Sequence, residues 1–580
     1  MNEVALSGSP GKRADVLGIG LLLSLPLLLL AVNNAWIFTS TDNIDPWIYH
    51  GYFREWHCFS SEFYPKAYYE DRLAWILPGF LAYRFFTPLI ANFVLHLGFY
   101  YTAVFSFYYV LKNTFDRRTA LLAAVFFGAD VYFLKSIGWD YVDGAGVTYY
   151  LLTLAFLTLA AKKDRGIWSV IAAGMAASSM ICAYPVWVVF TPPLFIYFWL
   201  AKSHFRKRPV LMGEIWKPVA LFFLGLFLQT LFFSLLAYRL KGKFHFYVNS
   251  ICMARRWMFV QNPWRTESSD WVWSARWLVM PLIVWGGAFA NLISRWRQIW
   301  RREWDLTLFH LINFGVYGVI FLIWELSGGV VLQQPYVTAM LLPTVYFAMG
   351  ALLLRVPKET RPFPYAFGLL TVIALFCLAL SPSWQDRLRP YLFFGRFECF
   401  DIAAVLFLGF AVILLKWRSS NKRMVFLSSA LGLSLAAMLL GSSFLPRQNG
   451  PERFLNVDSA MELVNRKMLG RSLKPFFWYH EKEEPFSAEF RSIASTYTWG
   501  PSILTLGFPS LENAKRGLPK PGQLVVVLSA QQDAARQAIV SLGAAGVESR
   551  LLERKVICYN AGCYSMSLIE AVGRDLKKTH

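Results

Sequence analysis

Long apolar runs separated by short charged gaps occupy the sequence up to about residue 445. A helix needs roughly 20 apolar residues to cross the hydrocarbon of a bilayer. Runs of 16 or more residues bounded by charge therefore predict about thirteen transmembrane helices. These runs lie at residues 16–38, 87–111, 119–136, 144–161, 166–182, 184–201, 216–238, 277–294, 306–325, 331–354, 363–381, 397–415 and 424–445. The expected fold class is a polytopic α-helical membrane protein.

One apolar segment, Leu73–Phe86, is shorter and contains Pro78 and Arg84, so it fits either a span or a helix on the membrane surface. Lysines and arginines separate these alternatives, because short cytoplasmic loops are enriched in them. When the segment lies on the surface, basic gaps such as 202–208 and 295–302 all fall on one side of the membrane. We therefore predict a surface helix, a cytoplasmic N-terminus and an odd number of spans.

The residues after 445 change in character, with more charges and an alternation of strand and helix patterns. Residues 522–529 read as a buried strand, 533–546 as an amphipathic helix ending at glycine, and 549–560 with 563–572 as a strand pair. The sequence thus predicts a transmembrane domain at 1–445 and a small soluble α/β domain at 446–580. On this topology, the second domain lies outside the cytoplasm.

Cys558 and Cys563 flank the predicted turn of the strand pair. Disulfides form in oxidising compartments, where the predicted topology places this turn. The spacing allows a disulfide across the hairpin, and the sequence leaves open whether the two cysteines are joined or free.

Composition agrees with a multi-pass protein of the inner or plasma membrane. Hydrophobic residues make up 56% of the chain and charged residues 16%. The net charge of +21 is explained by the basic gaps between spans, so it does not indicate a nucleic-acid partner. The sequence contains no P-loop and no dinucleotide fingerprint, and we expect no nucleotide cofactor.

Acidic residues gather in the first outer loop, residues 39–86. Asp45 follows the first span closely, and Glu70 and Asp71 stand with Arg72 before the short apolar helix. Carboxylates that aromatic neighbours partly desolvate at a membrane surface can accept a proton from a hydroxyl nucleophile. The alternative is that they keep the loop soluble and cap helices.

The first outer loop resembles the GT-C superfamily of membrane glycosyltransferases, in particular the branch with the aminoarabinose and protein O-mannosyltransferases. Asp45 followed by Tyr49 matches the acid and tyrosine after the first span. Glu70-Asp71-Arg72, followed by Pro78, resembles the second acidic element before a surface helix. This chain departs from the common form in having Asp45-Pro46 rather than two acids, and Arg72-Leu73 rather than Lys-Pro. The resemblance covers about the first 165 residues and the layout of spans followed by an outer domain.

The second outer gap carries two more acids, Asp140 and Asp143. Two carboxylates three residues apart can bind a divalent cation such as Mg²⁺ or Mn²⁺, or orient the base in the first loop. GT-C enzymes keep an acidic residue here, which the resemblance implies for one of the two. The alternative for Asp143 is a cap at the start of the next helix.

The long outer loop at 239–276 is basic and aromatic. It offers cations that can hold a phosphate head group, and the alternative is anchoring to anionic lipid. The predicted substrate-binding residues of both loops are Tyr49, Lys66, Arg72, Lys243, Arg255, Arg256 and Arg265.

The resemblance implies transfer of a sugar from a polyprenyl-phosphate donor to a lipid, glycan or protein acceptor on the outer face of the membrane. Inversion at the anomeric carbon is expected, with Asp45 as general base and Glu70, Asp71, Asp140 and Asp143 as further catalytic candidates. The alternative functions are a multi-span transporter or lipid flippase, and a scaffold or polymer ligase. Against transport, acids gather at one surface and no repeated halves are found.

Overall fold

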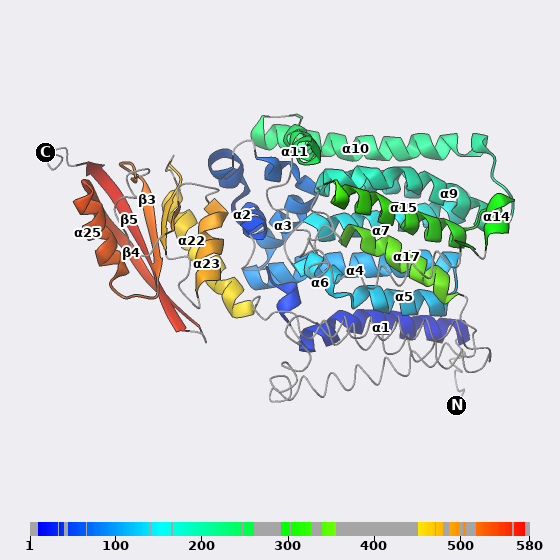
Figure 1. Cartoon of the computed structure of the whole chain (residues 1–580), viewed down its shortest axis with the longest axis horizontal. Helices are drawn as coiled ribbons and strands as arrows, with labels where there is room; N and C mark the ends of the chain where they lie inside the picture. The colour runs from blue at the N-terminus through cyan, green and yellow to red at the C-terminus, as the bar shows by residue number, and fades with distance from the viewer. Residues whose placement is uncertain are drawn as a thin grey trace, which may run out of the picture.

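The structure is a computed structural model. It describes residues 10–32, 34–39, 44–64, 67–138, 142–163, 166–242, 244–245, 247–259, 292–293, 295–301, 303–327, 339–354, 450–469, 471, 473–479, 486–497, 503–505, 518–559 and 562–574. Figure 1 shows a helical bundle at one end and a sheet with its helices at the other.

The helical bundle contains those predicted membrane spans that fall within the described residues. Its helices are α1 (Pro10–Val32), α2 (Ile44–Cys58), α3 (Leu73–Phe85), α4 (Pro88–Thr114), α5 (Arg117–Gly128), α6 (Val131–Gly138), α7 (Val142–Lys162), α8 (Ile167–Ala183), α9 (Thr191–Arg206), α10 (Trp216–Lys241), α11 (Val248–Phe259), α14 (Trp296–Trp300), α15 (Leu306–Leu326) and α17 (Leu342–Leu353). Short turns of other helix types lie at η1 (Asn34–Ile37), η2 (Phe59–Phe63), η3 (Tyr68–Asp71), η4 (Pro185–Phe190), η5 (Met212–Glu214) and η7 (Ala339–Leu341).

Several of these helices have the length and composition of membrane spans. Among the described residues they are Pro88–Thr114, Val142–Lys162, Pro185–Arg206, Trp216–Leu240 and Leu306–Leu326. The chain is therefore a multi-pass membrane protein, as predicted. The predicted spans at 277–294, 363–381, 397–415 and 424–445 lie almost wholly outside the described residues, so the total of thirteen stays a prediction.

The predicted span at 119–136 is broken into α5 and α6, which meet at an angle of 59°. Asp130 lies at the break, and its carboxylate accepts hydrogen bonds from the backbone N–H groups of Tyr132 (2.8 Å) and Phe133 (2.9 Å). The hydroxyl of Tyr346 in α17 donates to the same carboxylate at 2.6 Å. Burying a carboxylate is costly unless it is hydrogen-bonded. These three donors therefore allow Asp130 to be buried at the junction between α5 and α6. Hydropathy alone cannot reveal this break.

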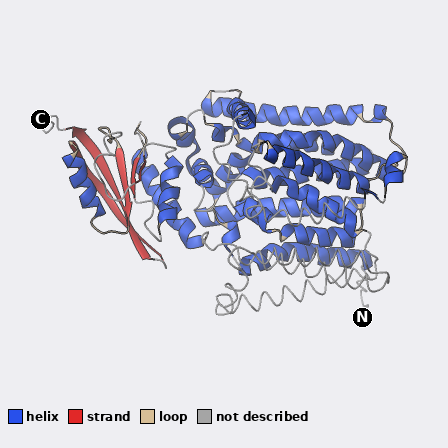
Figure 2. Ribbon diagram, in the orientation of Figure 1, coloured by secondary structure: helices blue, strands red, loops and turns tan. Residues whose placement is uncertain are grey.

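The C-terminal unit, the described part of residues 450–574, is a five-stranded sheet with helices on both faces (Figure 2). Its strands are β1 (Phe476–Tyr479), β2 (Ile503–Thr505), β3 (Leu524–Ser529), β4 (Val547–Tyr559) and β5 (Gly562–Arg574), in the order β2-β1-β3-β5-β4. Strands β1, β2 and β3 are parallel, while β5 runs antiparallel to both β3 and β4.

The sheet buries residues on both of its faces. On β3, Val525 and Val527 pack with the helix α25 (Ala534–Ala544), whereas Val526 belongs to the core on the other side. That side faces α22 (Pro451–Met468) and α23 (Ser487–Tyr497), which lie between the sheet and the bundle (Figure 1). The predicted strands and the helix at 533–546 are confirmed.

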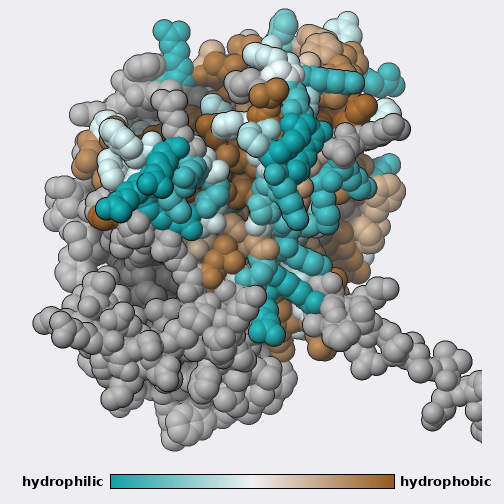
Figure 3. All heavy atoms as spheres, turned by 90° about the vertical axis from the view of Figure 1, so that its right-hand side faces the viewer, coloured by the Kyte–Doolittle hydropathy of each residue, from teal (hydrophilic) through white to brown (hydrophobic). Residues whose placement is uncertain are grey.

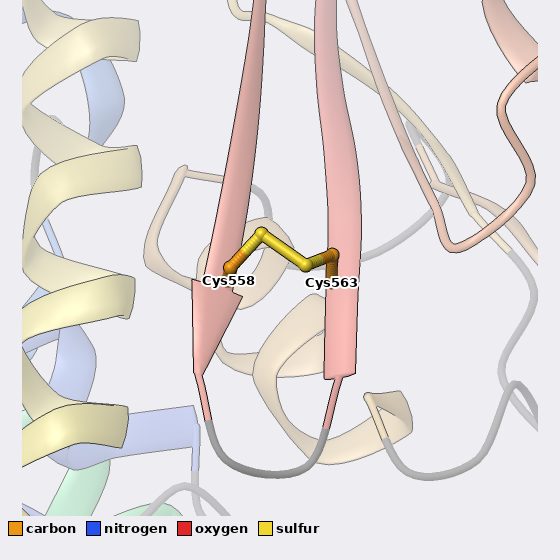
Figure 4. The surroundings of a disulfide bond; sticks show 2 residues. All are labelled: Cys558 and Cys563. Atoms are coloured by element: carbon orange, nitrogen blue, oxygen red, sulfur yellow. A yellow bond between two sulfur atoms is a disulfide. The ribbon is translucent and has the colours of Figure 1, made fainter.

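A disulfide, which the sequence left open, is present at the end of the β4–β5 hairpin. Cys558 and Cys563 are opposite one another in the strand register and are joined through their sulfur atoms, as Figure 4 shows.

The two ends of the bundle differ in charge. The basic gap at 202–208 and the helix α14 lie at the end farthest from the C-terminal unit, where hydrophilic side chains gather on the surface (Figure 3). The helices α2 and α3 lie at the opposite end, toward the C-terminal unit (Figure 1). The gap that the positive-inside argument assigns to the cytoplasm is thus separated from the acidic first loop by the length of the bundle.

Candidate functional site

Arg72 occupies the centre of a group of aromatic rings. It follows the short helix η3 and is 4% exposed. Its guanidinium carbon lies 4.9 Å from the ring centre of Tyr68, 5.0 Å from that of Tyr184 and 5.9 Å from that of Tyr49. A cation over aromatic faces is attracted by their negative π-clouds, and the rings also exclude water. The result is a buried positive charge with a restricted set of positions.

Asp45 lies in the first turn of α2 and acts electrostatically on Tyr49, as Arg72 does. It is partly buried, and the hydroxyl of Tyr69 donates a hydrogen bond to its Oδ1 at 2.5 Å. Tyr49 follows one turn later, and its ring contacts that of Tyr69 with centres 5.5 Å apart. The predicted pair of Asp45 and Tyr49 therefore faces the residues of the second acidic element.

Asp143 joins the same group from a different part of the chain. It lies in the first turn of α7, where its side chain is fully buried. Its carboxylate interacts electrostatically with Arg72 and with Asp45. Gly144 allows α7 to approach α6 closely, because an added Cβ there would lie 2.4 Å from the backbone oxygen of Ser136. The structure thus brings together three of the predicted site residues that lie far apart in the sequence.

Glu70 and Asp71 are buried and contact the long outer loop. The backbone N–H of Ser250, in the first turn of α11, donates to Oδ2 of Asp71 at 2.7 Å. The side-chain amide of Asn249 lies 3.5 Å from Oε1 of Glu70. Negative charge at a helix N-terminus satisfies free N–H groups and complements the helix dipole. Both carboxylates therefore fix α11 to the first outer loop.

Burial keeps the phenol of Tyr49 neutral. Burial raises the pKa of Tyr49 well above its ordinary value of 10.0, and the nearby Arg72 opposes that rise. The phenol is thus a hydrogen-bonding group rather than a proton acceptor at neutral pH.

The remaining predicted residues are distributed as follows. Arg255 is exposed on α11. The side chain of Arg256 and the residues Lys66, Asp140, Lys243 and Arg265 lie outside what the structure describes. Their roles stay predictions.

A metal site also stays untested. Among the described residues, no group of three or more histidines, cysteines or acids is placed to hold a metal ion. Asp140, one of the two predicted ligands, lies outside these residues. Within the described part of the site, Arg72 is the positive charge that acts on Asp143.

Sequence reasoning missed three tyrosines of the site. Tyr68 and Tyr69 immediately precede Glu70, and Tyr184 stands before Pro185 at the start of η4. A tyrosine pair next to an acid in an outer loop is a signal that the sequence offers. For Tyr184 the only signal in the sequence is that it is the first residue of the predicted span at 184–201.

No family model and no curated protein matches the sequence. Solved structures do match. The structure of ArnT from Cupriavidus metallidurans bound to undecaprenyl phosphate aligns with 96% of this chain and 98% of its own, with a TM-score of 0.50 and 13% sequence identity. Archaeal oligosaccharyltransferase AglB from Archaeoglobus fulgidus, in complex with an inhibitory peptide and a dolichol-phosphate, covers 90% of this chain and 70% of its own, with a TM-score of 0.46 and 11% identity. The likeness to ArnT over nearly the whole chain shows the GT-C fold, which confirms the resemblance found in the first outer loop.

Proposed function

We propose that this protein is a membrane glycosyltransferase that moves a sugar from a polyprenyl-phosphate donor to an acceptor. The observation that carries the proposal is the convergence of Asp45, Arg72 and Asp143 at one end of a GT-C fold. The structure of ArnT, which has this fold, was obtained with undecaprenyl phosphate bound.

Arg72 is assigned to bind the phosphate of the lipid donor and to stabilise it as the leaving group. Breaking the bond between sugar and phosphate leaves additional negative charge on the phosphate oxygens. A buried guanidinium interacts with such charge more strongly than an exposed one, because little water screens it. The rings of Tyr49, Tyr68 and Tyr184 hold the guanidinium in place before the substrate arrives.

Asp45 is assigned the role of general base. The acceptor hydroxyl attacks the anomeric carbon, its proton passes to Asp45, and the bonding electrons of the breaking C–O bond pass to the phosphate. A single displacement of this kind inverts the anomeric carbon. Asp45 suits the role better than Glu70 or Asp71, because those two carboxylates contact the first turn of α11.

Asp143 is assigned to orient Arg72. Its buried carboxyl group interacts electrostatically with the guanidinium and so favours one position of that side chain. A divalent cation would add Lewis-acid stabilisation of the leaving phosphate if Asp143 and Asp140 hold one, and no step above depends on it.

The reaction is assigned to the outer face of an inner or plasma membrane. The basic gap at 202–208 lies at the end of the bundle opposite to the site, and cytoplasmic loops collect such residues. The disulfide between Cys558 and Cys563 supports an oxidising compartment for the C-terminal unit, because such bonds persist there.

The test is transfer by the purified protein in lipid nanodiscs, with a panel of labelled undecaprenyl-phosphate hexoses and pentoses. Wild type should release free undecaprenyl phosphate, and Asp45→Asn should lower the rate by about 100-fold or more, because general-base catalysis contributes about that much. Glu55→Gln is the matched control, since it removes an exposed carboxylate from the same helix. Equal turnover of Asp45→Asn and wild type would sink the base assignment. Movement of intact donor across the membrane without release of lipid phosphate would favour a flippase instead.

A further inference from the structure

The helix α2 presents different residues to its two neighbours. Asp45 and Tyr49, one turn apart, contact residues of η3. His50 and Arg54, also one turn apart, contact α22 of the C-terminal unit. Residues four apart lie on the same face of a helix, so the two pairs form adjacent stripes. The helix that carries Asp45 is thus held between the site and the C-terminal unit.

Asp458 of α22 is the acceptor for both residues of the second stripe. His50 Nε2 donates to its Oδ1 at 2.8 Å, and Arg54 Nη1 lies 3.2 Å from the same carboxylate. The side chain of His50 is 0% exposed and that of Asp458 is 5% exposed. Removing one partner of a buried network leaves the other without compensation, so such networks tolerate little displacement.

An aromatic contact beside this network excludes water from the junction. The ring of Phe454, one turn before Asp458 on α22, lies 5.4 Å from that of His50 and 6.1 Å from that of Trp47. It also contacts Phe38, which follows η1. A shift of α2 along its axis would break the ion network and open this packing together.

A second aromatic contact anchors the end of α2. Tyr497 of α23 packs against Phe59 (5.8 Å) and Phe63 (5.1 Å) of η2, which continues directly from α2. The hydroxyl of Tyr64 donates to the backbone oxygen of Ser495 at 2.7 Å. The C-terminal unit therefore holds α2 at both of its ends.

We propose that the C-terminal unit positions the catalytic helix, with Asp458 and His50 as positioning residues that set where the carboxylate of Asp45 stands. The inference rests on the proposed function, because it assigns a purpose to a contact with the helix of the proposed base. It gives the C-terminal unit a role within the reaction rather than in binding a separate partner.

The experiment compares two substitutions that each neutralise a buried acid of the C-terminal unit. Asp458→Asn removes the charge that holds α2 and keeps the side-chain size. Glu489→Gln is the matched control, because Glu489 is fully buried and pairs at 2.9 Å with Arg453, a contact between α22 and α23 that does not involve α2. Both are made in the full-length protein in nanodiscs, and the thermal midpoint of each is measured beside kcat and the donor KM.

Positioning predicts that Asp458→Asn lowers kcat at least tenfold and changes the donor KM less than twofold. Glu489→Gln should keep kcat within twofold of wild type, even when its thermal midpoint falls as far as that of Asp458→Asn. His50→Gln should reproduce the loss, and the double variant should lose no more than either single one, because the two side chains act as one unit. Equal kcat losses in Asp458→Asn and Glu489→Gln at equal thermal midpoints would overturn the inference, since the role would then be structural only.

Hydrogen exchange of the α2 amides separates this inference from the proposed function, because it needs no turnover. Faster exchange at residues 44–58 in Asp458→Asn, but not in Glu489→Gln, supports the positioning of α2. If wild type transfers no sugar and α2 still loosens in Asp458→Asn, the proposed function fails alone. If wild type is active and neither kcat nor exchange changes in Asp458→Asn, the inference fails alone.

Discussion

The crossing of α8 and α10 in the bundle and the sheet of the C-terminal unit are packed by opposite means. In the crossing, Gly174 of α8 meets the backbone of Phe222, and Gly225 of α10 meets that of Ile171. A Cβ added at either glycine would lie about 2 Å from a backbone oxygen of the other helix. Further along, the hydroxyls of Ser178 and Thr230 are hydrogen-bonded at 2.8 Å. The two helices thus touch through their backbones.

The sheet buries large apolar side chains instead. Every residue of β3 is buried, with Val525 and Val527 on one face and Leu524 and Val526 on the other. Partly exposed positions of the sheet carry ion pairs, such as that between Arg471 and Glu570 of β5.

The difference follows from the solvent. In water, burial of apolar area stabilises a fold, whereas lipid is as apolar as leucine and gives no such drive between helices. Close backbone approach and hydrogen bonds replace it in the bundle. Enlarging a small residue at the helix crossing should therefore cost more stability than removing the disulfide or a partly exposed ion pair of the sheet.

The largest effect is expected at the helix crossing. Gly174→Ala places a Cβ 1.9 Å from the backbone oxygen of Phe222, which forces α8 and α10 apart. Overpacking of this kind costs about 3 kcal/mol at the upper end of measured values. Unfolding of the nanodisc- or detergent-held protein by SDS titration measures the loss.

Gly98→Ala on α4 is the control for the crossing, because nothing lies within 4 Å of a Cβ added there. It should change stability by less than about 1 kcal/mol. A Gly174→Ala protein as stable as wild type would show that the crossing is not backbone-packed.

The second effect is expected at the hairpin disulfide. Changing Cys558 and Cys563 together to serine removes a cross-link that closes a short loop, which should lower stability by about 2 kcal/mol. Thermal unfolding of the C-terminal unit within the full-length protein measures the change. A reductant should destabilise wild type by the same amount and leave the double variant unchanged. Cys252→Ser, at an exposed free thiol on α11, should have no effect.

The smallest change in stability is expected when the pH is lowered. Hydrogen bonding from Arg471 holds the pKa of Glu570 below its ordinary value of 4.5. A carboxyl with a depressed pKa stabilises the fold above the unfolded value, and this contribution is lost as the pH falls through the folded value. Since both side chains are partly exposed and solvent screens the pair, the loss should be below about 1 kcal/mol.

The thermal midpoint of the C-terminal unit, followed from about pH 6 to about pH 3, checks this window. Glu570→Gln should remove part of the acid dependence. Glu548→Gln, at an exposed position on β4, should leave it intact. The same acid response in both variants would show that the ion pair between Arg471 and Glu570 contributes nothing.

The sequence by itself determined the elements whose pattern is local. A bilayer requires every backbone group of a span to bond within its own helix, so one apolar run contains enough information to predict one span. The strands and the helix at 522–572 were equally readable, because alternation and glycine turns are also local. The Asp45–Tyr49 pair was found through the resemblance to GT-C enzymes, whose motif is also local: the two residues lie one turn apart on α2.

Only the tertiary structure decided which of these elements meet. The convergence of Asp45, Arg72 and Asp143, the break at Asp130 and the contact of His50 with Asp458, separated by 408 residues, all depend on how helices pack. Hydropathy records which residues leave water, and it does not record which buried residues become neighbours. Contacts between residues far apart in the chain leave no local pattern in a single sequence. They can be identified only when the helices are placed side by side.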